Sequence, residues 1–136
     1  MNYGYSDTNT ANHIILNPDD EENRMLIQLY HHVASSISIT DKKVLEVGSG
    51  RGGGASYIAQ YFNSSSIVGI DFSENAVEFC NNVHHINGLQ FQVGDAENLP
   101  FDDSSFGAVI NVESSHCYGN FPKFHQEVTR VLKPEG

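Results

Sequence analysis

Residues 44–54, VLEVGSGRGGG, decide the fold of this 136-residue chain. An apolar run typical of a buried strand leads into a glycine-rich turn, and apolar residues then recur at helical spacing. Glycine permits positive φ and lets a ligand approach the bare backbone beside a helix N-terminus. The stretch therefore predicts a strand, a ligand-binding turn and a helix in succession.

The same alternation continues along the chain. Strands are predicted at 44–48, 66–71, 89–94 and 107–112, and helices at 53–62, 74–85 and 121–132. Ser73 precedes the second of these helices as its N-cap. Because strands that alternate with helices form parallel sheets through right-handed crossovers, we predict an α/β fold with a doubly wound parallel sheet and flanking helices.

An N-terminal segment at 1–40 precedes the domain predicted at 41–136. Asn17 and Pro18 suit the N-cap and first position of a helix, and acidic residues follow at 19–22, where the helix dipole favours negative charge. Apolar residues then recur at helical spacing at Leu26, Leu29, Tyr30 and Val33. We therefore expect a cap segment whose helix packs one face on the domain.

Acidic residues dominate the charge of the chain. There are 17 Asp and Glu against 7 Lys and Arg, and the net charge of -10 argues against nucleic acid as a partner. We find no leader sequence and no apolar run of bilayer length, and expect no membrane insertion and a cytoplasmic location. Cys80 and Cys117 match neither a disulfide framework nor a metal motif. The adjacent histidines at 31–32 and 84–85 point apart on helices, so no metal site is predicted.

The glycine turn fits two ligand templates. The glycines of 48–53 satisfy GxGxxG, and Asp71 at the end of the second strand suits binding of ribose hydroxyls, as in a nicotinamide-dependent oxidoreductase. Residues 46–52, EVGSGRG, also satisfy an acidic-x-GxGxG pattern, in which a carboxylate inside the strand helps to hold the cationic amino group of a methionine moiety. An anionic pyrophosphate needs no such carboxylate, so Glu46 favours the second template.

Three further motifs follow the turn in order: GDAENLPF at 94–101, FGAVI at 106–110 and LKPEG at 132–136. Together with the glycine turn, they resemble the motifs of the class I S-adenosylmethionine-dependent methyltransferases, and the resemblance extends over residues 44–136. Two positions depart from the family pattern. Gly107 stands where the family often has Asp, and Glu135 replaces the first glycine of the LKPGG turn.

The resemblance implies a Rossmann-like sheet whose C-terminal strands are missing here. It also implies an enzyme that transfers a methyl group from S-adenosylmethionine, leaving S-adenosylhomocysteine, to a small-molecule or lipid acceptor by direct displacement. The acceptor atom is expected to be a hydroxyl oxygen. A nicotinamide-dependent oxidoreductase and a non-enzymatic module that keeps only the cofactor cradle remain as alternatives.

The resemblance also assigns the cofactor-binding residues. It implies the methionine end for Glu46, Gly48, Ser49, Gly50 and Gly52, the ribose for Asp71, and the adenine for Phe72, Asp95 and the Ala96 amide, with Asn111 at the end of the fourth strand as a further member. From the residues alone, the two aspartates also suit turn formers, and the phenylalanine suits a core position.

The acceptor is expected after the fourth strand, because open α/β sheets bind ligands at the carboxyl ends of their strands. His116 is the first candidate for the general base, since imidazole titrates near neutral pH, and Glu113 is the second. The alternative for the histidine is a side chain that hydrogen-bonds within the loop or only shapes the pocket.

Shorter stretches indicate a subfamily. They are NYGY at 2–5, IQLYHH at 27–32, GSGRGGGASYI at 48–58 and NVESSHCYG at 111–119. Together they are similar to the mycobacterial phthiotriolone and phenolphthiotriolone dimycocerosate methyltransferases and their relatives, which methylate a hydroxyl on a lipid of polyketide origin. Because the family's sheet continues beyond its fourth strand, strand 107–112 is expected at an edge here, where its apolar sequence predicts self-association of the isolated chain.

Overall fold

The computed structural model describes residues 2–9 and 13–136. Within these residues, four parallel strands form one sheet in the order β3-β2-β1-β4. The strands are β1 Lys43–Val47, β2 Ser66–Asp71, β3 Leu89–Val93 and β4 Ala108–Ile110. The α-helices are α1 Arg24–Ala34, α2 Gly53–Tyr61, α3 Glu74–Val83 and α4 Phe121–Val131, and the 3-10 helices are η2 Pro18–Asn23 and η3 Ser115–Cys117.

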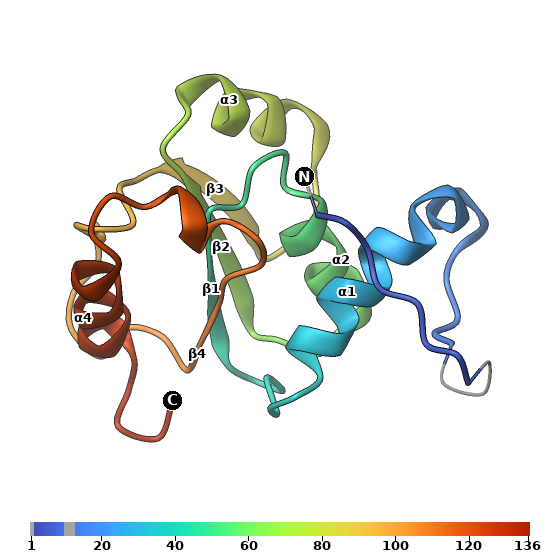
Figure 1. Cartoon of the computed structure of the whole chain (residues 1–136), viewed down its shortest axis with the longest axis horizontal. Coiled ribbons are helices and arrows are strands. Elements are labelled where there is room, and N and C mark those ends of the chain that lie inside the picture. Colours follow the sequence, from blue (N-terminus) through green and yellow to red (C-terminus); the bar gives the residue numbers. More distant parts are fainter. Residues whose placement is uncertain (1, 10–12) are drawn as a thin grey trace.

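Helices cover both faces of the sheet, as the doubly wound prediction requires. Side chains alternate between the two faces of a strand, so Val44 joins the core cluster under α1, α2 and α3, whereas Leu45 joins the cluster under α4. Figure 1 shows α4 on the side of the sheet opposite α1 and α2. The predicted α/β class is therefore confirmed, and Glu46, two residues after Val44, faces the α1 and α2 side.

β4 is shorter than predicted and lies at an edge, as expected. The prediction of a strand at 107–112 was wrong at both ends. The Gly107 amide still donates to the Lys43 carbonyl, but the strand has ended by Asn111, whose side-chain amide donates to the Val47 carbonyl at an N···O distance of 2.9 Å. A side chain thus replaces the next backbone partner of β1. Self-association through this edge stays a prediction.

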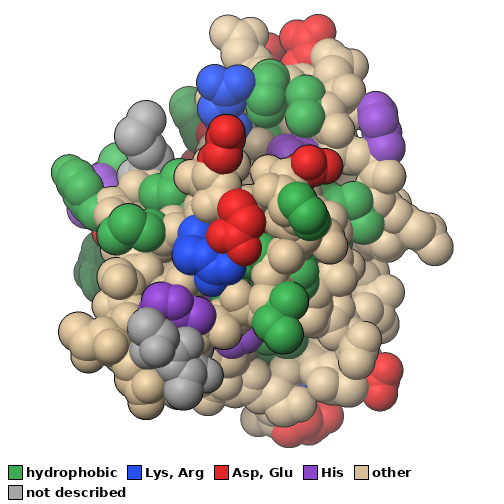
Figure 2. All heavy atoms as spheres, turned by 90° about the vertical axis from the view of Figure 1, so that its right-hand side faces the viewer, with side chains coloured by type: hydrophobic (Ala, Val, Ile, Leu, Met, Phe, Trp, Pro, Cys, Tyr) green, Lys and Arg blue, Asp and Glu red, His purple; other side chains and the backbone are tan. Residues whose placement is uncertain are grey.

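The N-terminal segment lies along α1. The Tyr5 amide donates to the Met25 carbonyl, and the Asn2 side chain donates to the Leu26 carbonyl at 3.3 Å. Figure 2 shows this side of the molecule, where hydrophobic side chains stand exposed among charged side chains and histidines. Two details of the predicted helix were wrong: its first turn is the 3-10 helix η2, without a capping bond from the Asn17 side chain, and Leu26 is 37% exposed. The division after residue 40 stays a prediction.

A buried ion pair ties α4 to the loop that follows β3. Glu127 is 5% exposed, and its carboxylate accepts from the Leu99 amide at 2.9 Å and from the Arg130 guanidinium at 2.7 Å. The guanidinium also donates to the carbonyls of Leu99 and Phe101. Hydrogen bonding to Arg130 lowers the pKa of Glu127 to about 2. The loop that carries Asp95 is thereby anchored to the helix beneath it.

Replacing Glu127 with Ala is expected to destabilise the fold by about 2 kcal/mol, because the Leu99 amide loses its acceptor and the guanidinium keeps only Asp103 and two carbonyls. The loss should be largest above pH 4.5 and should shrink as pH falls toward 2, since the lowered pKa stabilises the folded state only while the carboxylate is ionised. Chemical unfolding across this range measures it. Glu78→Ala, at an exposed position of α3, is the control and should change little; equal losses in both variants would contradict the assignment.

Candidate functional site

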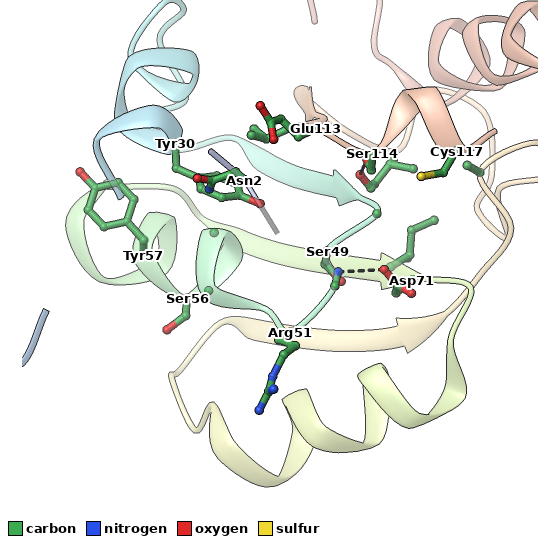
Figure 3. A pocket seen from close by; sticks show the side chains of 18 of the residues that line it. Asn2, Tyr30, Ser49, Arg51, Ser56, Tyr57, Asp71, Glu113, Ser114 and Cys117 are labelled. Carbon is green, nitrogen blue, oxygen red and sulfur yellow. Dashed lines mark hydrogen bonds between the residues drawn. The ribbon is translucent and has the colours of Figure 1, made fainter. Parts of the chain in front are cut away.

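A cavity of about 1040 Å³ opens at the carboxyl ends of β1 and β2. Its walls come from α1, the glycine turn and first turns of α2, the ends of β2 and β3, and the loop after β4. Figure 3 shows Tyr30, Ser49, Asp71, Glu113 and Ser114 around this space. The predicted residues that line it are Gly48, Ser49, Gly50, Asp71, Phe72, Asp95, Ala96 and Glu113.

The glycine turn is held against the sheet by its own backbone. The amides of Gly48 and Ser49 both donate to the Ile70 carbonyl, at 2.9 and 2.8 Å. Gly48 has φ 74°, and a Cβ atom there would lie 2.3 Å from the Ser114 Oγ. Only glycine fits both the backbone angle and the space at this position. The turn and the loop after β4 are therefore in direct contact.

The outer side of the turn is fixed by α3. The Cys80 thiol donates to the Gly50 carbonyl at 3.3 Å, and His84 Nε2 lies 2.8 Å from the Arg51 carbonyl oxygen. A Cβ atom on Gly52 would come within 2.7 Å of the Phe91 ring. Gly52 does not line the cavity, so the structure gives it a packing role in place of the expected ligand contact.

Asp71 combines the two roles that its sequence position allowed. One carboxylate oxygen accepts from the Gly50 amide at 2.8 Å, the bond dashed in Figure 3, and the other accepts from the Ser73 amide at 2.9 Å. It stabilises the turn and also faces the cavity. Its neighbour Phe72 is 77% exposed at the rim, so the core alternative for Phe72 is excluded.

Asp95 and Ala96 form the far wall of the cavity. The Asp95 carboxylate accepts from the Glu97 amide at 2.8 Å, which is the turn-forming bond anticipated for this residue. It remains exposed toward the cavity. The turn therefore fixes the carboxylate without burying it, and leaves oxygen lone pairs for a ligand.

Glu46 is the buried charge of the site. It is 1% exposed, and neither carboxylate oxygen has a hydrogen-bond partner among the described residues; the buried Ser49 Oγ is likewise unpaired. Burial raises the pKa of Glu46 to about 8, although the nearby Tyr30 hydroxyl and Ala55 amide act in the opposite direction. Unpaired buried polar groups are costly. Their gathering beside one cavity indicates a place for a polar, cationic ligand group.

Tyr30 and Gly54 separate Glu46 from the cavity, and the sequence reasoning missed both residues as part of the site. Both line the cavity, whereas Glu46 does not. A Cβ atom on Gly54 would lie 2.0 Å from the Tyr30 ring and 2.6 Å from Glu46 Oε1. The third glycine of the GGG run was the available signal, because it permits this close approach between helices.

The residues predicted in the loop after β4 fall into two groups, those that line the cavity and those that hold the loop in place. Glu113 lines the cavity and has φ 51°, a left-handed conformation uncommon outside glycine. The Asn111 Nδ2 atom lies 2.9 Å from the Val47 carbonyl oxygen, 2.7 Å from Ser114 Oγ and 2.9 Å from the Tyr118 hydroxyl, and these contacts hold the loop against β1.

Asn111 and His116 are not brought to the cavity wall. The hydrogen bonds of Asn111 are directed into the loop and to β1, which corrects its expected ligand contact. His116 is exposed on η3. Ser114 and Tyr118, which the sequence did not single out, line the cavity in their place.

Among the described residues, no group of three or more His, Cys, Asp or Glu is placed to hold a metal ion. No helix in the described part of the chain has the length and apolar character needed to cross a membrane.

Comparison with known proteins identifies relatives over the whole chain. Residues 45–136 match the family model described as "Methyltransferase domain". A fatty-acid O-methyltransferase of Mycolicibacterium smegmatis is 48% identical over 136 residues, which are 100% of this chain and 49% of the relative. A phthiotriol/phenolphthiotriol dimycocerosates methyltransferase of Mycobacterium tuberculosis is 49% identical over 121 residues, 89% of this chain and 45% of the relative. The chain thus spans about half the length of these curated relatives.

A solved structure shares the fold. The chain superimposes on a SAM-dependent methyltransferase from Aquifex aeolicus with a TM-score of 0.71 and 20% sequence identity, over 87% of this chain and 63% of the other. The comparison supports the parallel sheet with flanking helices described above.

Replacing Glu46 with Gln is expected to stabilise the fold at neutral pH. A pKa raised from 4.5 to about 8 means that stability is fully present below pH 4.5 and is lost as pH rises through 8. Removing this ionisable group should raise the free energy of unfolding by roughly 3 kcal/mol at neutral pH. Urea unfolding below pH 4.5 and near pH 8 tests the sign, with Glu78→Gln on exposed α3 as the control. A variant that follows the wild-type pH profile would refute the expectation.

Proposed function

The chain belongs to the methyltransferase domain family, and from this premise we propose that the protein transfers a methyl group from S-adenosylmethionine to a hydroxyl oxygen of a small-molecule or lipid acceptor. The predicted class I resemblance is confirmed by the family match and by relatives at 48% and 49% identity. The names of those relatives, a fatty-acid O-methyltransferase and a phthiotriol methyltransferase, support an oxygen acceptor on a lipid.

One observation carries the choice of cofactor: buried oxygen atoms without hydrogen-bond partners lie beside the glycine turn at the ends of the strands. The Glu46 oxygens and Ser49 Oγ lack partners among the described residues, and the residues present suit the ammonium group of a methionine moiety. A dinucleotide would bring an anionic pyrophosphate to the same turn, and this group offers the buried carboxyl no cationic partner. This disfavours the nicotinamide-dependent alternative.

The remaining cofactor contacts follow from the order of side chains along the cavity. We assign the ribose hydroxyls to Asp71, whose carboxylate keeps lone pairs beyond its bonds to the Gly50 and Ser73 amides. Phe72 at the rim and Asp95 with Ala96 at the far wall are assigned to the adenine.

S-adenosylmethionine, when bound, supplies a methyl group already activated on a sulfonium. The chain's own residues must then hold the acceptor in line and receive its proton. Glu113 is the better placed of the two proposed bases, because it lines the cavity and His116 does not. Its backbone is left-handed, and Figure 3 shows its side chain above β1.

We also propose a cytoplasmic location. Cys80 and Cys117 are both free thiols, which suits a reducing compartment. A non-enzymatic module that keeps only the cofactor cradle is the second candidate. Cofactor binding without turnover by the protein would favour that candidate.

Asp71→Ala is expected to weaken binding of S-adenosylhomocysteine by about 1.5 to 3 kcal/mol through lost charge-assisted hydrogen bonds. Calorimetry with the 2′,3′-dideoxy analogue separates ribose binding from the support that Asp71 gives the turn. The analogue should bind wild type and variant alike. A variant that loses as much affinity for the analogue as for the parent compound would mean that Asp71 acts only on the turn.

Glu113→Gln is expected to lower turnover by roughly a hundredfold or more while leaving cofactor affinity nearly unchanged, because the amide cannot take the acceptor's proton. Single-turnover rates with a lipid acceptor that carries an alcohol hydroxyl, together with calorimetry, provide the two readouts. His116→Ala is the matched comparison and should retain turnover. Loss of turnover in His116→Ala, with turnover retained in Glu113→Gln, would assign the general base to His116.

A further inference from the structure

Tyr30 stands between the cavity and the buried carboxylate of Glu46. Its side chain lines the cavity, whereas that of Glu46 does not, and both Glu46 oxygens are shielded from solvent. A ligand in the cavity therefore contacts Tyr30 before the carboxylate. Figure 3 shows Tyr30 reaching in from α1.

Gly54 fixes where the Tyr30 ring lies. A Cβ atom on Gly54 would be 2.0 and 2.2 Å from Tyr30 Cε1 and Cζ, and 2.6 Å from Glu46 Oε1. Tyr30 Cζ, which carries the phenol hydroxyl, and Glu46 Oε1 therefore both lie within 2.6 Å of the position that a Cβ atom of residue 54 would occupy on the first turn of α2. Any side chain at 54 would displace one of them.

The chemistry of the pair sets the direction of the hydrogen bonds. Burial, and next the negative charge of Glu46, raise the pKa of Tyr30, so its hydroxyl keeps its proton. An ionised carboxylate only accepts hydrogen bonds, whereas a phenol hydroxyl donates one and can accept others. An ammonium group in the cavity would favour the ionised form of Glu46. Toward that ionised carboxylate the hydroxyl can act only as a donor, and its lone pairs stay available to a donor in the cavity.

We propose that Tyr30 accepts a hydrogen bond from the ammonium group of the cofactor's methionine moiety and donates one to Glu46, so that the buried carboxylate acts on the cofactor through the phenol. Tyr30 is then a cofactor-binding residue and Glu46 a positioning residue. The inference rests on the proposed function, and it makes α1 of the N-terminal segment part of the cofactor site.

A double-variant cycle on the chain tests the relay. Tyr30→Phe keeps the ring against Gly54 and removes only the hydroxyl, and Glu46→Gln removes only the charge. Each should weaken binding of S-adenosylhomocysteine by about tenfold to a hundredfold, the range for a hydrogen bond to a charged group. Because both variants interrupt the same chain of hydrogen bonds, the double variant should lose little more affinity for S-adenosylhomocysteine than either single variant.

Ligands that lack one group each identify what Tyr30 contacts. A deaminated analogue that keeps the carboxylate should bind the wild type and Tyr30→Phe equally, and so should 5′-methylthioadenosine, which lacks both groups. Tyr61→Phe is the matched control, because Tyr61 does not line the cavity and its hydroxyl donates to the Asp20 carboxylate at 2.6 Å. It should leave the affinity for every ligand unchanged.

Unchanged affinity of Tyr30→Phe for S-adenosylhomocysteine would overturn the relay, and so would additive losses of affinity in the double variant. A Tyr30→Phe variant that loses as much affinity for the deaminated analogue as for S-adenosylhomocysteine would mark a purely structural role and would also overturn it. A wild type that binds none of the three ligands would instead overturn the proposed function. The two failures are therefore distinguishable. Binding is read by calorimetry, and a thermal melt confirms that each variant is folded.

Discussion

The carboxylate of Glu46 is buried at the end of the central strand without a hydrogen-bond partner among the described residues, and the site is organised around it. A strand position flanked by Leu45 and Val47 ordinarily holds an apolar side chain, because burying an ionised group costs several kcal/mol. Here the burial cost is visible in the pKa of about 8.

Around that residue, the glycine turn is held from outside so that its inner surface remains free. Asp71 binds the Gly50 amide, and Cys80 and His84 contact the carbonyls of the turn from α3. Preorganised backbone groups cost a ligand little reorganisation when it binds. The helix behind the turn therefore contributes to the proposed cofactor site by supporting the turn.

The loop after β4 shows the same division between support and contact. The side-chain amide of Asn111 contacts the Val47 carbonyl and the hydroxyls of Ser114 and Tyr118, and this fixes the loop against the end of β1. Glu113 is then left facing the cavity in a left-handed conformation. Asn111 thus belongs to the support of the site and Glu113 to its contact surface, and their positions in the sequence do not distinguish the two roles.

The sequence by itself determined the order of strands and helices, the glycine turn, and the acidic residues at the ends of β1, β2 and β3, because periodicity and turn chemistry are local properties. Only the tertiary structure decided that Tyr30 covers Glu46, that Gly52 serves packing, and that His116 lies away from the cavity. These outcomes depend on contacts between segments far apart in the chain. The distance between α1 and α2 is set by side-chain packing, and no local pattern encodes it.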